Sequence, residues 1–198
     1  MRRKTLLMCG AVVVVALLVG AAYAAGLPPF KEKGEIDAAD LCPSLGNSSQ
    51  SLTALKEVLP DRDSYSFEDN VSPLTESRAA DFTSRCFVDG DSDQLLVAKT
   101  EMLEDDSGTS WATWVKGTVT HAQGTTPFEA GTKAFASGRL AAIYMPCTTK
   151  PVTNISVAVD LKVKGSASPA KSRTDLIVLA KNVAKFAHHK ARCTSPGI

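Results

Sequence analysis

The sequence lacks most of the patterns that mark catalytic, metal-binding or nucleic-acid-binding sites. Its 5 cysteines include no C-x-x-C pair, which argues against a zinc site and against dithiol redox chemistry. It contains no G-x-S-x-G motif, the usual turn around a serine nucleophile. Basic residues do not cluster with interleaved aromatic residues, as they do on nucleic-acid-binding surfaces. We therefore expect no metal, no cofactor and no nucleic-acid partner.

One acidic segment partly matches a calcium-binding loop. Asp89, Asp91 and Asp93 have the spacing of the first ligands of such a loop. The match then fails, because Gln94 stands where the loop needs glycine and Thr100 where it needs a bidentate glutamate. We interpret the segment as a solvated hairpin turn.

Charged residues are also absent from residues 6–27, directly after the basic segment 2–4. About 20 uncharged residues can span a bilayer, and basic flanks stay on the cytoplasmic side. We therefore predict that residues 1–27 form a signal anchor, a single-pass transmembrane helix with the N-terminus in the cytoplasm and the rest of the chain outside. The small-x-small pattern Ala22-Tyr23-Ala24 leaves an alternative open, in which cleavage at Ala24 releases a secreted protein.

Four cysteines follow this segment: Cys42, Cys86, Cys147 and Cys193. An even number of cysteines in an exported chain indicates disulfides, and four cysteines allow three connectivities. We favour Cys42–Cys86 and Cys147–Cys193, because each bridge then links residues within one half of the domain. In the chain-entropy model each such bridge stabilises the fold by roughly 4 kcal/mol.

The net charge of +1 hides a strong asymmetry between the two halves of the chain. Residues 31–110 contain 18 acidic and 7 basic residues, whereas residues 111–198 contain 3 acidic and 12 basic residues. Such polarity can steer a partner or hold two halves of one domain together.

Residue periodicity predicts the elements of the acidic half. A helix capped by Ser48 or Ser49 ends near Leu59, where Pro60 follows. A strand is possible over residues 65–70. Residues 82–88 and 96–102 alternate as two further strands, and the turn between them makes a hairpin.

The basic half is predicted in the same way. Residues 111–120 fit either a short helix or a strand, and residues 117–138 are rich in Gly and Thr and expected to be mostly loop. Residues 140–145 read as a buried strand, and residues 155–163 as a strand with one face buried and one in water. Thr174 is expected to cap a last helix that ends near residue 192.

This order of elements predicts an α+β fold, an antiparallel sheet with flanking helices that is stapled by disulfides and preceded by the transmembrane helix. We divide the chain into the anchor at residues 1–27, a linker at 28–40 and an extracytoplasmic domain at 41–195.

Two groups of residues are candidates for a binding surface. Trp111 and Trp114 lie three positions apart, so both fit one face of a helix. An exposed pair of this kind would mark a contact surface, and a buried pair would be core. Lys181, Lys185 and His189 form a basic face on the predicted last helix, suited to anionic headgroups or a protein partner.

The segment Gly138-Arg139-Leu140-Ala141-Ala142-Ile143-Tyr144-Met145-Pro146-Cys147, together with Phe186-Ala187 ahead of Cys193, carries a resemblance. The chain resembles small membrane-anchored extracytoplasmic proteins of unassigned function from actinobacteria. The resemblance implies location and architecture, and it transfers no catalytic residue.

The expected function is therefore a non-enzymatic, membrane-anchored binding or interaction module with a partner at the cell surface. An accessory or regulatory subunit of a membrane complex, held through residues 6–27 in the bilayer, is an alternative. A hydrolase acting on envelope material, with the lone His121 as its base, is the weakest alternative.

Overall fold

The computed structural model describes residues 34–72, 82–104, 108–119, 123–149 and 152–197. The chain divides into two units, Met1–Gly34 and Glu35–Ile198. Every described helix and strand belongs to the second unit. The predicted transmembrane helix at residues 1–27 lies outside the described residues, and no helix within them is long and apolar enough to cross a membrane.

The described elements of the second unit follow one another in the order two helices, three strands, one helix, four strands and one helix. They are the 3₁₀ helix η1 (Pro43–Leu45), α2 (Ser48–Val58), β1 (Tyr65–Ser72), β2 (Thr83–Gly90), β3 (Asp93–Glu104), α3 (Gly108–Thr118), β4 (Thr126–Pro127), β5 (Lys133–Ala136), β6 (Leu140–Thr149), β7 (Val152–Leu161) and α4 (Pro169–Lys190).

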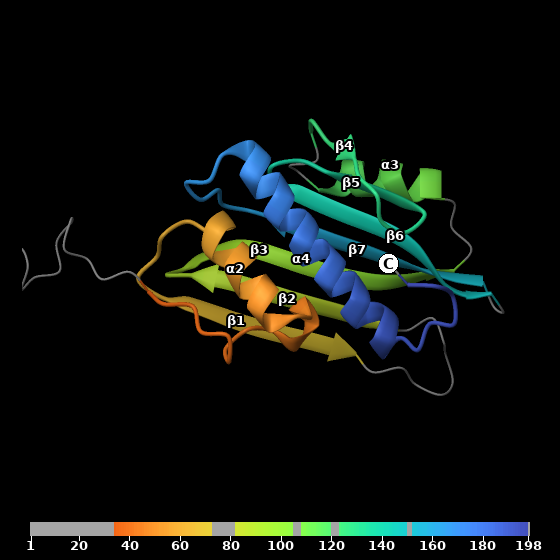
Figure 1. Ribbon diagram of the computed structural model, residues 1–198, viewed down its shortest axis with the longest axis horizontal. Helices are drawn as coiled ribbons and strands as arrows, with labels where there is room; N and C mark the ends of the chain where they lie inside the picture. Colours follow the sequence, from red (N-terminus) through yellow and green to blue (C-terminus); the bar gives the residue numbers. More distant parts are fainter. Residues whose placement is uncertain (1–33, 73–81, 105–107, 120–122, 150–151, 198) are drawn as a thin grey trace, which may run out of the picture. The chain divides into compact units, whose positions relative to one another are not determined.

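All strands form one antiparallel sheet in the order β1-β2-β3-β7-β6-β5-β4, which confirms the predicted α+β class (Figure 1). The acidic half of the chain supplies β1 to β3, and the basic half supplies β4 to β7. The two halves join at the centre of the sheet, where β3 pairs with β7 and Met102 lies opposite Ile155. The acidic and basic halves of the sequence therefore form the two sides of a single sheet.

Helices α2 and α4 cover one face of this sheet (Figure 1). The buried side chains of α4 that face it include Leu176, Leu179 and Val183, and they pack with the inward residues of the strands in the main core. Ile36 also belongs to this core, so the folded unit begins within the segment that we assigned to the linker.

Helix α3 covers only part of the opposite face. Trp111 and Val115 pack with Phe135, Leu140 and Tyr144 in a second, smaller core over β5 and β6. The segment that fitted either a helix or a strand is thus a helix as far as Thr118.

The prediction that one face of the 155–163 strand is in water was wrong. Ser156 and Asp160, on the outward face of β7, are 3% and 6% exposed. The reason is tertiary, since β7 lies at the centre of the sheet and α3 packs beside it: Trp111 donates a hydrogen bond of 2.8 Å from its Nε1 to Ser156 Oγ.

Helix α4 begins six residues earlier than predicted. Ser168 caps it by accepting a hydrogen bond from Lys171 N, and Pro169 fits the first turn because its fixed φ suits a helix and its missing N–H has no partner there. Thr174 instead lies inside the helix, and its hydroxyl donates to Ala170 O. The cap of α2 is also shifted, to Asn47.

Both predicted disulfides are present. Cys42–Cys86 links the residue before η1 to β2, and Cys147–Cys193 links β6 to the segment after α4. Residues 117–138, predicted to be mostly loop, contain the short strands β4 and β5, which extend the sheet beyond β6.

Polar contacts at two levels join α2 and α4 as antiparallel neighbours. Near the end of α2, Lys171 Nζ lies 3.5 Å from Glu57 and donates to Asp175 Oδ2 at 2.6 Å. The hydrogen bond to Asp175 raises the pKa of Lys171. Near the start of α2, Asn182 Nδ2 donates to Ser51 Oγ at 3.2 Å. Beyond Asn182, α4 continues past the first turn of α2.

Candidate functional site

A groove of about 450 Å³ lies where α4 continues past the start of α2. Ligand pockets in proteins commonly measure about 300 to 1,000 Å³, so the groove is large enough for a small molecule or for the anchoring group of a larger partner. The residues that line it are Pro43, Gly46, Asn47, Gln50, Asn182, Lys185, Phe186 and His189.

The groove is positively charged. Lys185 and His189 lie one turn apart on α4, so they share one face of the helix. None of the lining residues is an Asp or a Glu, and Lys185 forms no ion pair with any residue in the described ranges. The facing wall offers the side-chain amides of Asn47 and Gln50, and it has no titratable group.

A close approach of two backbones fixes the depth of the groove. Gly46 has a φ of +75°, and a Cβ placed on it would lie 2.5 Å from the backbone oxygen of Asn182. Only glycine allows the turn between η1 and α2 to lie this near α4. Asn182 is 4% exposed and donates to Ser51, whose hydroxyl donates in turn to Leu45 O at 2.8 Å.

The η1 wall is also held from the sheet side. Cys42, directly before η1, is bonded to Cys86 on β2. Asp69 on β1 accepts hydrogen bonds from Ser44 N at 3.0 Å and from Ser44 Oγ at 2.6 Å. The groove is therefore built from fixed elements on both sides, which lowers the entropic cost of binding.

The structure brings together two of the three predicted basic residues. Lys185 and His189 both line the groove, whereas Lys181 does not. The Lys181 ammonium instead lies 5.9 Å from the centre of the Phe128 ring.

The two tryptophans do not share a surface. Trp111 is completely buried, and its ring centre lies 5.3 Å from that of Phe135 and 5.2 Å from that of Tyr144. Trp114 is 46% exposed, with the Lys99 ammonium 5.5 Å from its ring centre. The proposed binding role of Trp111 is therefore wrong, because the ring is core, and only Trp114 is available to a partner.

A crevice of about 80 Å³ lies beside Trp114, between α3 and the outward face of β3 and β7. Val115, Val119 and Ala158 make up much of its wall, and Lys99 lies at its edge with its ammonium 2.6 Å from Glu101. At this size it accepts at most one aliphatic side chain. It is a weaker candidate than the groove.

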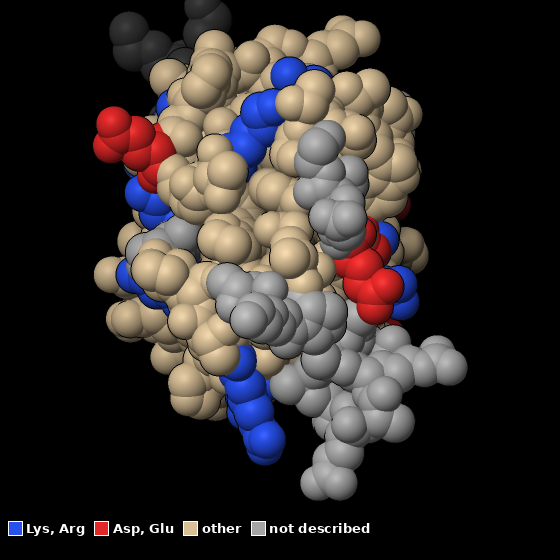
Figure 2. Space-filling model, turned by 90° about the vertical axis from the view of Figure 1, so that its right-hand side faces the viewer, with Lys and Arg blue, Asp and Glu red and all other residues tan. Residues whose placement is uncertain are grey.

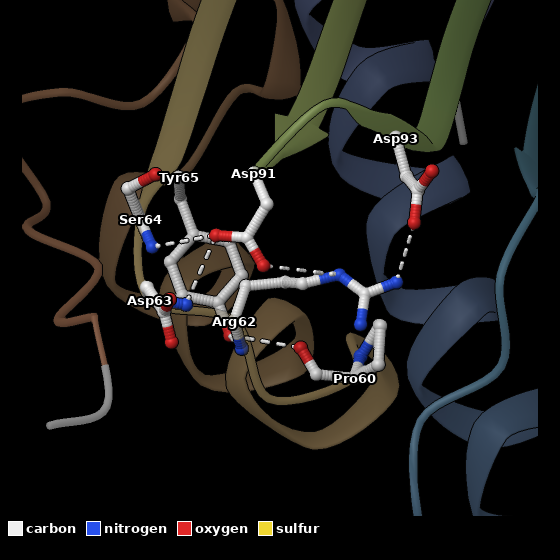
Figure 3. A network of polar contacts seen from close by, with 7 residues as sticks. All are labelled: Pro60, Arg62, Asp63, Ser64, Tyr65, Asp91 and Asp93. Carbon is white, nitrogen blue, oxygen red and sulfur yellow. Dashed lines mark hydrogen bonds and ion pairs between the residues drawn. The ribbon is translucent and has the colours of Figure 1, made fainter. Parts of the chain in front are cut away.

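Arg62 contacts the acidic segment that partly matches a calcium-binding loop (Figure 3). Arg62 Nη2 lies 2.8 Å from Asp93 Oδ2, and Arg62 Nε lies 3.9 Å from Asp91 Oδ2. The other oxygen of Asp91 accepts hydrogen bonds from the backbone N–H groups of Asp63 and Ser64. These carboxylates join the segment before β1 to the β2–β3 turn, which is a structural role.

Other candidates for chemistry are either dispersed or outside the described residues. Within the described ranges, no group of three or more His, Cys, Asp or Glu side chains could hold a metal ion. His121, the base of the hydrolase alternative, lies outside the described residues.

Figure 2 shows the end of the molecule where β6 and β7 meet, the right-hand side of Figure 1. On this face, Lys and Arg side chains stand apart from one another among uncharged residues, with a few Asp and Glu between them. The visible part of this end has no continuous basic patch.

Only one wall of the groove could be predicted from the sequence. The spacing of Lys185 and His189 identified the α4 wall, but the η1–α2 wall carries no distinctive motif. The available signal was the sequence Pro43 to Asn47, where Gly46 and Asn47 precede a helix. It marks a helix start and says nothing about which element lies against it.

Comparison of the chain with protein-family models, with curated proteins and with solved structures finds no match. The groove's own geometry is therefore the basis for a function.

Proposed function

We propose that this protein is a non-enzymatic binding module on the outer side of the cell membrane, and that it binds its partner in the groove between α2 and α4. The observation that carries the proposal is a preformed groove of about 450 Å³ in which Lys185 and His189 face amide side chains and no carboxylate. A lysine in a groove without a carboxylate is suited to recognising a partner of opposite charge.

The location is supported by the sequence. An uncharged run at residues 6–27 after a basic segment is typical of a signal anchor. Two disulfides are typical of a domain in an oxidising compartment. The resemblance to membrane-anchored extracytoplasmic proteins of actinobacteria agrees with both features.

A photo-cross-linking amino acid at Gln50, which is exposed and lines the groove, tests the binding role. Irradiation of intact host cells is expected to attach this variant to one discrete species, seen as a single added mass in mass spectrometry. The same amino acid at Lys56, exposed on α2 but outside the groove, is the control and is expected to give no such added mass. Equal capture at both positions, or capture at neither, would refute the groove as the binding site.

The intact mass of the protein isolated from its host tests the anchor. Retention of residues 1–27 is expected, together with a gain of about four hydrogens on reduction, from two disulfides. A mass that lacks the residues up to Ala24 would instead identify a released protein. That result would exclude an accessory subunit that acts through its own anchor, and it would leave the groove proposal intact.

A further inference from the structure

We infer that the groove binds a phosphomonoester group, with Lys185 and His189 on one side of the phosphate and the amides of Asn47 and Gln50 on the other. This inference rests on the proposed function, since it names the chemistry of the ligand in the same groove. The first reason is charge: the α4 wall carries the Lys185 ammonium, and no lining residue is an Asp or a Glu.

The second reason is the supply of hydrogen-bond donors. A lysine ammonium has three N–H groups, each amide side chain has two, and a neutral histidine ring has one. Lys185, His189, Asn47 and Gln50 bring these donors to the groove from both walls. A phosphomonoester presents three terminal oxygens and a charge near −2. A carboxylate has only two oxygens, so it would leave some of these donors without an acceptor.

The third reason is the apolar surface beside the charged groups. Phe186 and Pro43 line the groove together with the polar residues, and Phe186 is only partly buried. The Lys190 ammonium lies 5.7 Å from the centre of the Phe186 ring, and Lys190 is not among the lining residues. An organic group attached to the phosphate would therefore contact an aromatic side chain, while the phosphate contacts Lys185 and His189.

Titration of the purified full chain with phenyl phosphate tests the inference. Calorimetry measures the affinity, and NMR spectra record the side-chain amide signals of Asn47 and Gln50 during the titration. Phenyl phosphate is expected to bind and to shift both signals, and benzoate is expected to bind at least about fivefold more weakly. Lys185→Gln and His189→Gln are each expected to weaken phenyl phosphate binding about tenfold, the usual effect of losing one charge-assisted contact.

Lys164→Gln is the matched control, because Lys164 is also exposed, is absent from the groove lining, and loses the same charge. It is expected to change the affinity less than about twofold. Equal weakening by Lys185→Gln and Lys164→Gln would show nonspecific attraction and overturn the inference, as would equal affinity for benzoate. Since Lys185 is exposed, an unchanged melting temperature of its variant will show that the fold is intact.

A second experiment shows whether the phosphate group belongs to a lipid headgroup or to a soluble ligand. Vesicles of phosphatidylcholine containing phosphatidic acid, which presents a phosphomonoester, are compared with phosphatidylcholine alone. Binding of phenyl phosphate and of the phosphatidic acid vesicles, both reduced by Lys185→Gln, assigns a lipid headgroup. Binding of phenyl phosphate alone assigns a soluble ligand. Cross-linking at Gln50 without any phenyl phosphate binding would overturn this inference and leave the proposed function standing, whereas failure of both experiments would remove both.

Discussion

Replacing Trp111 with alanine is expected to lower the free energy of unfolding by about 4 kcal/mol, as is usual for a fully buried tryptophan. The side chain is 0% exposed and lies at the centre of the smaller core. Its ring contacts those of Phe135 and Tyr144, with centres 5.3 and 5.2 Å away. Because α3 contributes only Trp111 and Val115 as buried residues, loss of the indole also loosens the whole helix from the sheet.

Part of this loss comes from a hydrogen bond. Trp111 Nε1 donates to Ser156 Oγ at 2.8 Å, and Ser156 is 3% exposed. Trp111→Phe keeps an aromatic ring but removes the donor, so it is expected to cost about 1 to 2 kcal/mol. The difference between the two variants measures the part of the packing that a phenyl ring restores.

Trp114→Ala is the matched control, since it makes the same change one helical turn away. Trp114 is 46% exposed, and Lys99 is its cation–π partner at 5.5 Å. Loss of this exposed contact is expected to cost less than about 1 kcal/mol. Urea denaturation followed by circular dichroism measures all three variants. Similar losses for Trp111→Ala and Trp114→Ala would contradict the orientation of α3.

This pair of tryptophans shows what local sequence could and could not predict. A spacing of three places both residues near one side of a helix, and it leaves open where the boundary between core and solvent falls. That boundary depends on how α3 lies on the sheet. The outward face of β7 is a similar case: Ser156 and Asp160 look like solvent positions, but the strand is central and partly covered.

Features that depend on neighbouring residues were predicted well. The β2–β3 hairpin, the buried β6 and the helical character of α2 and α4 follow from alternation and periodicity. The early start of α4 was missed although its signal is local, since Ser168 followed by Pro169 is a good helix N-terminus. The pairing of β3 with β7 has no local signal, because it joins segments that are far apart in the sequence.

The same distinction applies to the groove. Lys185 and His189 lie four residues apart on one helix, so their common face is a property of the sequence. Their position opposite Asn47 and Gln50 is a tertiary property, which depends on the approach of Gly46 to within van der Waals contact of α4. A sequence argument could name these two side chains, and it could not show that they line a concave surface.

Removing the Cys147–Cys193 bridge with alanine at both positions is expected to cost about 4 kcal/mol, because 46 residues separate the two cysteines and the chain-entropy term grows slowly with loop length. The bridge also holds the segment after α4. Thr194 N and Ser195 N both donate to Cys147 O, at 2.8 and 3.0 Å, and the His188 ring nitrogen lies 2.8 Å from Ser195 O.

Removing Cys42–Cys86 in the same way is expected to cost a nearly equal amount, since 44 residues separate this pair. Its effect on function is expected to be larger. This bridge holds η1, one wall of the groove, whereas Cys147–Cys193 lies at the end of α4 beyond His189. Phenyl phosphate affinity should therefore fall more in the Cys42–Cys86 variant than in the Cys147–Cys193 variant at equal stability.

A chain without either bridge is expected to lose about 8 kcal/mol, which is comparable to the whole free energy of unfolding of a typical domain. It should therefore be largely unfolded at 37 °C, whereas each two-cysteine variant remains folded. Urea denaturation of the three variants measures this series, and peptide mapping without reduction identifies the bridges in the parent chain. A cross-linked peptide that joins Cys42 or Cys86 to Cys147 or Cys193 would contradict the fold itself, because the two bridges attach different segments to different strands of the sheet.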